Sequence, residues 1–321
     1  MNLAELGPDE KIYWRQGQMV RERGPFEGLR ALCERFQSDP DAKLFPSPLR
    51  WLWIWLTAIV SPVSRNGLAF LSAIAMGPTV AWAVAPLGLS PWAFLLASSS
   101  PLLWCLSRRM LQDCTVALAV VVSLGTALHG SPVWFAVSLF VLLSLKEVAV
   151  LFVPGLTLAA AATMPTVAEA LCATAIGCSS AALAMRAIVG RETFRVFRLA
   201  PQASQNGYTQ LYQRGAPHRL VIDLVMVSPL TTVWFLASDP PLSITAFVAV
   251  TLAAHAFAPA RNVRFILALD IAMRAAVAGY LGVWSLPLFA ADALLFLKLL
   301  DVYDPVSHVL TKAFEMAPKE S

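Results

Sequence analysis

Two adjacent carboxylates, Asp9 and Glu10, stand at the head of a polar N-terminal segment, and the chain after residue 48 is mostly apolar. Chemistry at a membrane surface needs polar groups, and this pair is the first candidate for acid–base work. Helix capping is the alternative, because Pro8 suits the first turn of a helix and acidic side chains complement the positive N-terminal end of the helix dipole. The spacing alone favours capping, whereas the features of the rest of the chain increase the support for a functional role.

Ionisable residues inside or next to the apolar segments are few, so each one is informative. Lys146 is hard to explain by packing, because a buried ammonium costs several kcal/mol without a partner. The adjacent Glu147 is a candidate partner, although neighbouring residues of a helix do not face each other well. Arginines that only reach towards lipid headgroups are the alternative for the basic members. The full set is Arg65, Arg108, Arg109, Asp113, Lys146, Glu147, Asp223, Arg261, Arg264, Asp270 and Arg274.

The chain of 321 residues is 58% hydrophobic and 14% charged, which is far from the composition of a soluble protein. A helix needs roughly 20 apolar residues to cross a bilayer, and the sequence holds many such runs. We therefore expect an all-α, polytopic helical membrane protein with about nine to ten transmembrane helices. The net charge of +4 gives no support for nucleic-acid binding, and the five cysteines show no metal-ligand spacing.

Apolar periodicity predicts one membrane domain, residues 1–321, with polar helices at its N-terminus. Residues 9–37 show near-helical spacing of apolar side chains, which predicts one or two amphipathic helices on the membrane surface. Residues 49–60 contain three tryptophans and are too short to cross, so we expect them at the interface. Transmembrane helices are expected at 66–86, 91–107, 113–129, 131–146, 147–162, 165–187, 219–237, 242–258 and 264–284, with an ambiguous run at 286–300. The polar parts are an external loop over 1–65, a second loop over 188–218 and a tail over 301–321.

If these helices cross the membrane one after another, the charged residues fall unevenly on the two membrane faces. If 49–60 does not cross, the face that carries residues 9–65 also receives Arg108, Arg109, Asp113, Lys146, Glu147, residues 188–218, Arg261 and Arg264. The opposite face receives short, almost uncharged links at Leu87–Ser90, His129–Gly130 and Met164–Pro165. A site that binds an anion is one reason for such a face to depart from the rule that basic loops stay in the cytoplasm.

The order of these features resembles the GT-C membrane glycosyltransferases, and most closely the branch with protein O-mannosyltransferases and the lipid A aminoarabinose transferase. The resemblance covers roughly residues 7–285, and its motifs share one face. In chain order they are the Asp9–Glu10 pair with Tyr13, the turn Phe45-Pro46-Ser47-Pro48-Leu49, Arg65 before Leu71-Ser72-Ala73, Ser100-Pro101, Ser107-Arg108-Arg109 with Asp113, Leu145-Lys146-Glu147 before Phe152-Val153-Pro154, and Arg261 with Arg264-Phe265.

The resemblance implies that a sugar moves from a polyprenyl-phosphate carrier to an acceptor hydroxyl of a lipid, glycan or protein, with inversion. Asp9 matches the catalytic carboxylate and would take the hydroxyl proton, with Glu10 as its support. The phosphate leaving group needs cations, for which Arg65, Lys146 and Arg264 are the candidates. Asp113 matches a second acidic residue that would bind acceptor, donor sugar or a cation. Further substrate-binding candidates are Tyr13, Arg108, Arg261 and His218.

Two ways of neutralising the carrier phosphate stay open. A divalent cation such as Mg²⁺ or Mn²⁺ could be held by Asp9 or Asp113, or lysine and arginine could act alone. Residues 188–218 would be the flexible external loop over the active site, with a solvated basic linker as the equal alternative. His129, His255 and His308 have no partners by spacing and receive no role.

The resemblance also implies a bacterial inner-membrane protein, surrounded by lipid, with its site on the external, periplasmic face. Family members carry a transmembrane helix before the acidic pair, whereas six residues precede Gly7 here. Either that helix has been lost or the start of the chain lies further upstream. The alternative function is a non-catalytic polytopic protein, such as a transporter, an assembly subunit or a degenerate homologue. A transporter should place ionisable residues near the middle of broken helices, often in two repeated halves, and no repeat is found.

Overall fold

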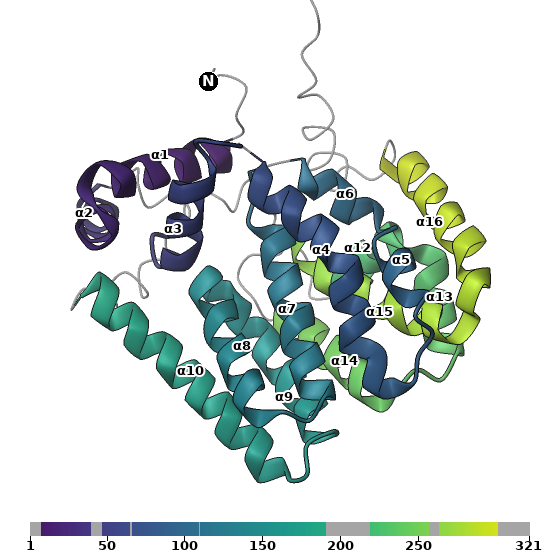
Figure 1. Ribbon diagram of the computed structural model, residues 1–321. Coiled ribbons are helices and arrows are strands. Elements are labelled where there is room, and N and C mark those ends of the chain that lie inside the picture. The colour runs from purple at the N-terminus through teal and green to yellow at the C-terminus, as the bar shows by residue number, and fades with distance from the viewer. Residues whose placement is uncertain are drawn as a thin grey trace, which may run out of the picture.

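The computed structural model describes residues 8–39, 47–64, 66–108, 110–190, 219–256 and 263–300 (Figure 1). Within these ranges every regular element is a helix, as the sequence predicts. The α-helices are α1 (Pro8–Arg23), α2 (Pro25–Ser38), α3 (Trp51–Val60), α4 (Gly67–Val84), α5 (Ala93–Ala97), α6 (Pro101–Ser107), α7 (Asp113–Leu128), α8 (Pro132–Leu145), α9 (Val153–Ala161), α10 (Val167–Val189), α12 (Arg219–Val227), α13 (Pro229–Ala237), α14 (Leu242–Ala256), α15 (Leu267–Leu281) and α16 (Ser285–Leu300). Short 3₁₀ turns are η3 (Ala85–Leu87), η4 (Glu147–Phe152), η5 (Val263–Ile266) and η6 (Gly282–Trp284).

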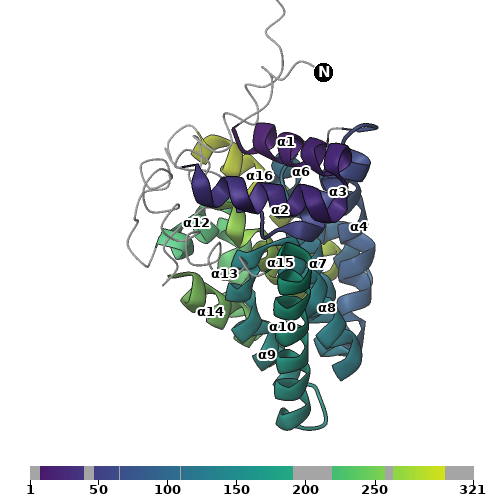
Figure 2. The same ribbon diagram turned by 90° about the vertical axis from the view of Figure 1, so that its left-hand side faces the viewer.

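The N-terminal helices α1, α2 and α3 pack on one another at one end of the bundle (Figures 1 and 2). Gly24 (φ 91°) turns the chain between α1 and α2, in a conformation that favours glycine. A Cβ at Gly28 would lie 2.7 Å from the Cα of Val20, so only glycine lets the two helices approach this closely. The buried face of α2 repeats at helical spacing, as the sequence predicts, and comprises Leu29, Leu32, Cys33 and Phe36.

The rest of the chain is a bundle in which α7 packs against α4 and α8, and α10 runs along α8 and α9 (Figure 2). Small residues permit the closest approaches between helices, a feature that is also common where helices pack inside membranes. A Cβ at Gly125 would lie 2.4 Å from the Trp82 ring, and one at Gly177 would lie 2.7 Å from the carbonyl oxygen of Ala136. These positions hold α7 against α4 and α10 against α8.

Three segments of the described chain are long and apolar enough to cross a membrane: Gly67–Leu87, Val167–Val189 and Arg264–Leu297. The sequence predicts nine or ten such helices. The five shorter apolar helices have 10–17 residues. A helix of that length is roughly 15–26 Å long, below the roughly 30 Å of a bilayer core. The structure therefore shows fewer full-length spans than the expected count.

Two expected spans are broken, which corrects the sequence prediction. Residues 91–107 form two short helices, α5 and α6, separated by Ser98–Ser100. Residues 219–237 form α12 and α13, which meet at an angle of 103° at Ser228. In both cases a serine precedes a proline that begins the next helix. Proline has no amide hydrogen and is tolerated in the first turn, so each Ser-Pro pair ends one helix and starts another.

Candidate functional site

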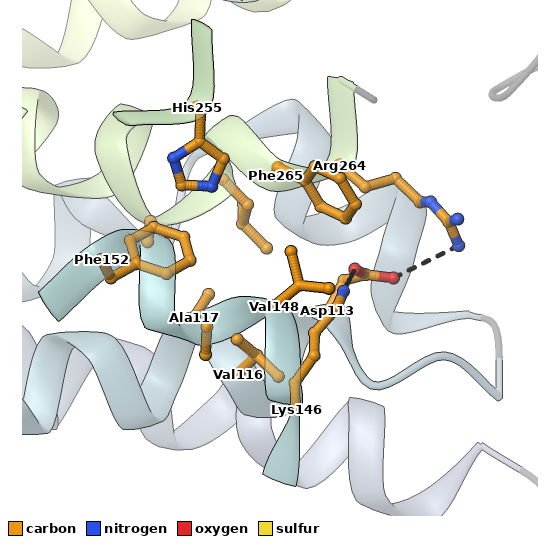
Figure 3. Close-up of a pocket in the computed structure, with 12 residues that line it drawn as sticks. Asp113, Val116, Ala117, Lys146, Val148, Phe152, His255, Arg264 and Phe265 are labelled. Atoms are coloured by element: carbon orange, nitrogen blue, oxygen red, sulfur yellow. Dashed lines mark hydrogen bonds and ion pairs between the residues drawn. The ribbon is translucent and has the colours of Figure 1, made fainter. Parts of the chain in front are cut away.

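An ion cluster of three side chains lies where three helices begin or end (Figure 3). Asp113 begins α7, Lys146 follows the last residue of α8, and Arg264 belongs to η5 just before α15. Lys146 Nζ donates to Asp113 Oδ1 at 3.1 Å, and Arg264 Nη1 donates to Asp113 Oδ2 at 3.4 Å. All three side chains are largely buried, so these contacts are poorly screened by solvent. The structure thus brings together three of the residues that the sequence singles out.

The backbone explains why Lys146 can reach Asp113. Lys146 is extended (φ −156°, ψ 121°) and ends α8, and a 3₁₀ turn follows it. Its side chain therefore turns away from that of Glu147, the candidate partner that the sequence offers, and Glu147 pairs with Arg50 instead. Asp113, on the neighbouring α7, is the partner of Lys146. The separation of 33 residues between these two charges shows why local spacing does not reveal the pair.

A small cavity of about 20 Å³ adjoins this ion cluster, and a cavity of that size has room for about one water molecule. Its aromatic side includes Phe152 and Phe265 (Figure 3). Lys146 Nζ lies 4.6 Å from the centroid of the Phe265 ring, a cation–π contact. His255, to which the sequence gave no role, also lines the cavity. The site therefore combines a charged end with an aromatic end.

A second buried ion pair lies at the same end of α8. Arg50 binds both oxygens of Glu147, with Nε–Oε2 at 2.7 Å and Nη2–Oε1 at 2.8 Å. Its remaining nitrogen, Nη1, donates to the Tyr13 hydroxyl at 2.6 Å. The predicted site residue Tyr13 thus connects α1 to η4 through one arginine, and its ring packs edge-on against Trp53. Sequence reasoning missed Arg50, although it directly follows the proline-rich turn that ends at Leu49.

The acidic head of α1 docks on the segment that leads into α7. Glu10 is fully buried, and one of its carboxylate oxygens accepts a hydrogen bond from the backbone N–H of Met110 at 2.8 Å. Met110 precedes Asp113 by three residues. Asp9 belongs to α1, and its side chain lies outside the described residues. Glu10 is therefore anchored to the segment that leads into Asp113, rather than merely capping an isolated surface helix.

Of the remaining predicted site residues, the structure describes the side chain of Arg108 alone. The Arg108 side chain is exposed and does not line the cavity. Arg65, Arg261, His218 and all of the 188–218 loop after residue 190 lie outside the described residues.

A divalent cation does not fit at Asp113. Both of its carboxylate oxygens already accept hydrogen bonds from cationic side chains, which would repel Mg²⁺ or Mn²⁺. In the part of the chain that the structure describes, no three histidine, cysteine, aspartate or glutamate side chains gather as a metal would require. We therefore derive no step through a metal at this position.

No family model, no curated protein and no solved structure matches this chain. We therefore infer its function from the side chains and their geometry.

Proposed function

We propose that this protein is a membrane glycosyltransferase that moves a sugar from a polyprenyl-phosphate carrier to an acceptor hydroxyl. One observation carries the proposal. Glu10, in the acidic pair, binds the backbone just ahead of Asp113, and two cations from distant parts of the chain converge on Asp113. A base candidate and a phosphate-binding candidate thus occupy one end of the bundle, as transfer from a phosphate requires.

Lys146 and Arg264 are suited to the leaving group. When the bond between the anomeric carbon and the carrier phosphate breaks, negative charge grows on the phosphate oxygens, and fixed cations stabilise that charge. Asp113 holds both cations in place, because an ammonium and a guanidinium side by side would otherwise repel each other. In this proposal the Asp113 carboxylate positions the cations and has no direct part in the chemistry.

Asp9 is the proposed base. It takes the proton of the acceptor hydroxyl while that oxygen bonds to the anomeric carbon from the side opposite the phosphate, so the sugar inverts. The bond to the phosphate breaks with its electron pair on the leaving oxygen. Glu10 is anchored by the Met110 N–H and fixes the first turn of α1, so we assign it a positioning role.

The membrane placement is part of the proposal. Gly67–Leu87, Val167–Val189 and Arg264–Leu297 would cross the bilayer, and the shorter apolar helices would be embedded beside them. Large apolar side chains are exposed along α10, as lipid contact requires. They include Val167, Leu171, Ile176 and Leu183. We place the ion cluster at the external face of a bacterial inner membrane, because the links at the other ends of α7, α8 and α9 are short and carry almost no charge.

A transporter is the second candidate, and one observation favours it. Asp270 and Arg274 lie fully buried between the two broken helix pairs, where charged groups of transporters are expected. Arg274 lies in the middle of α15 rather than near one of its ends. The hydrogen bonds of both residues to the helix breaks also explain them as structural residues, so we rank this function second.

The discriminating experiment measures sugar transfer in nanodiscs that contain the full chain. The donor is undecaprenyl phosphate carrying a radiolabelled sugar, and the acceptor is a bacterial membrane extract. Asp9→Asn should abolish transfer while donor binding and thermal stability stay unchanged, and Lys11→Gln on the same turn is the control. Transfer by Asp9→Asn at the wild-type rate would refute the base assignment. No transfer and no donor binding by the wild type would refute the enzyme.

A further inference from the structure

Besides the ion cluster, the cavity is lined by one further polar group, the imidazole of His255 in the last turn of α14 (Figure 3). The side chain is 2% exposed. Its ring lies edge-on to Phe152, with centroids 4.8 Å apart, and 6.2 Å from the centroid of Phe265. The proposed transfer reaction makes no use of this histidine, and packing alone does not require a polar ring between two phenyl rings.

One hydrogen bond settles which nitrogen of His255 can accept. Nδ1 lies 2.9 Å from the carbonyl oxygen of Thr251, one turn earlier on α14. A carbonyl oxygen only accepts hydrogen bonds, so Nδ1 carries the hydrogen and the lone pair of the neutral ring is on Nε2. In Figure 3 the other ring nitrogen points into the space that the labelled residues enclose. His255 therefore presents a fixed acceptor to the cavity.

Phe265 separates this acceptor from the cationic end of the site. Lys146 Nζ lies 4.6 Å from the Phe265 ring centroid on the charged side, and the His255 ring lies 6.2 Å from the same centroid. In a sugar-phosphate donor the sugar ring is attached to the phosphate. A donor whose phosphate lies near Lys146 and Arg264 would therefore bring its sugar ring towards Phe265. The cavity of about 20 Å³ admits a group the size of water, and a hydroxyl has that size.

We propose that His255 Nε2 accepts a hydrogen bond from a hydroxyl of the donor sugar, and that His255 thereby selects donors with a neutral, hydroxyl-bearing sugar over the bare carrier phosphate. This inference rests on the proposed function. It assigns His255 as a specificity-determining residue that acts separately from the base and from the phosphate-binding cations. A buried acceptor discriminates strongly, because a ligand without the matching hydroxyl leaves it unpaired.

The test compares the binding of two kinds of lipid to the full chain in nanodiscs. One is undecaprenyl phosphate, and the other is the same lipid carrying mannose, glucose or arabinose. The wild type should bind at least one sugar lipid more tightly than the bare phosphate. His255→Phe keeps the aromatic bulk and removes the acceptor, so it should weaken binding of that sugar lipid by about 5- to 10-fold, the loss of one hydrogen bond. Its affinity for undecaprenyl phosphate should stay unchanged.

Two further variants separate recognition from folding. His255→Gln can place an amide oxygen near the position of Nε2, so it should recover part of the preference for the sugar lipid. His129→Gln is the matched control. His129 directly follows the last residue of α7, roughly 24 Å along the helix from Asp113, and its Nε2 lies 2.9 Å from the carbonyl oxygen of Trp82. This variant should leave the affinity for both lipids unchanged.

The outcomes distinguish this inference from the function on which it rests. An unchanged preference for the sugar lipid in His255→Phe would overturn the inference and leave the glycosyltransferase proposal intact. An equal loss of affinity for both lipids in His255→Phe would also overturn the inference, because His255 would then only support the fold. If the wild type bound none of the lipids, both proposals would fail.

Discussion

Asp270 and Arg274 lie one turn apart on α15 and form an ion pair with no exposed surface, with Nε–Oδ1 at 2.9 Å. Ser100 and Ser228, the serines at the two helix breaks, both donate to the Asp270 carboxylate, at 2.6 and 2.5 Å. Arg274 also lies 3.6 Å from Asp292 on α16. One buried pair therefore ties both interrupted helices to α15, the helix that directly follows the 3₁₀ turn containing Arg264.

Removal of Arg274 should destabilise the fold strongly. Arg274→Met would leave two buried carboxylates without their cation, and breaking a buried pair in this way costs about 3–5 kcal/mol. We expect a large loss of thermal stability in detergent, measured by the unfolding midpoint. Arg30→Met, at an exposed position of α2, is the control and should change the midpoint little. A wild-type midpoint for Arg274→Met would show that the network does not hold the helix breaks.

Lys146→Ala should weaken donor binding more than it weakens folding. The variant removes one of two proposed phosphate ligands but leaves Asp113 its bond to Arg264. We expect the affinity for undecaprenyl phosphate to fall about tenfold or more, because a hydrogen bond to a charged group contributes about 1.5–3 kcal/mol. Arg108→Ala removes an exposed cation that lies five residues before Asp113 in the sequence, and this variant should bind as the wild type does. Unchanged affinity in Lys146→Ala would give Lys146 a purely structural role.

Arg50 and Glu147 should be energetically coupled. Two parallel hydrogen bonds join these largely buried side chains, and such pairs show coupling energies of about 0.5–3 kcal/mol. A double-mutant cycle with Arg50→Ala and Glu147→Ala, read out by chemical unfolding, measures the coupling. Tyr13→Phe removes only the hydroxyl that accepts from Arg50 and should cost less than either charge deletion. Additive effects in the cycle would contradict the geometry.

Cys33 should react slowly with maleimide at pH 8. Burial, reinforced by the neighbouring Glu34 charge, raises the pKa of the Cys33 thiol from its usual 9.0 to about 12, so very little of the reactive thiolate is present. Its rate should keep rising about tenfold per pH unit beyond pH 9. A cysteine placed at the exposed Arg30 in a Cys33→Ala background should level off near pH 9. If the reaction rates of the two cysteines depended on pH in the same way, α2 would not bury Cys33.

The raised pKa of the Cys33 thiol should also make the free energy of unfolding decrease as the pH rises above 9. Between pH 9 and pH 12 the thiol ionises in the unfolded chain but stays protonated in the folded one. Stability from this group is therefore fully present below pH 9 and declines as pH rises towards 12.

The sequence by itself determined the helical class, the amphipathic helices before residue 39 and the short α3, because composition and apolar periodicity act locally. It also marked Asp113, Lys146 and Arg264, since a charge among apolar residues is costly enough to need a function or a partner. The breaks at Ser100 and Ser228 were equally present as Ser-Pro pairs. Hydropathy nevertheless predicts continuous spans there, because it is averaged over a window of residues and does not register the loss of one amide hydrogen.

Only the tertiary structure decided which charges pair. Asp113 meets Lys146 and Arg264 across 33 and 151 residues, and Arg50 meets Glu147 across 97. These pairings depend on how α3, α7, α8 and α15 pack. Packing follows from the shapes of the side chains along whole helices rather than from local spacing. For the same reason His255 has no visible role in the sequence, since its place in the cavity depends on α14 lying against α9.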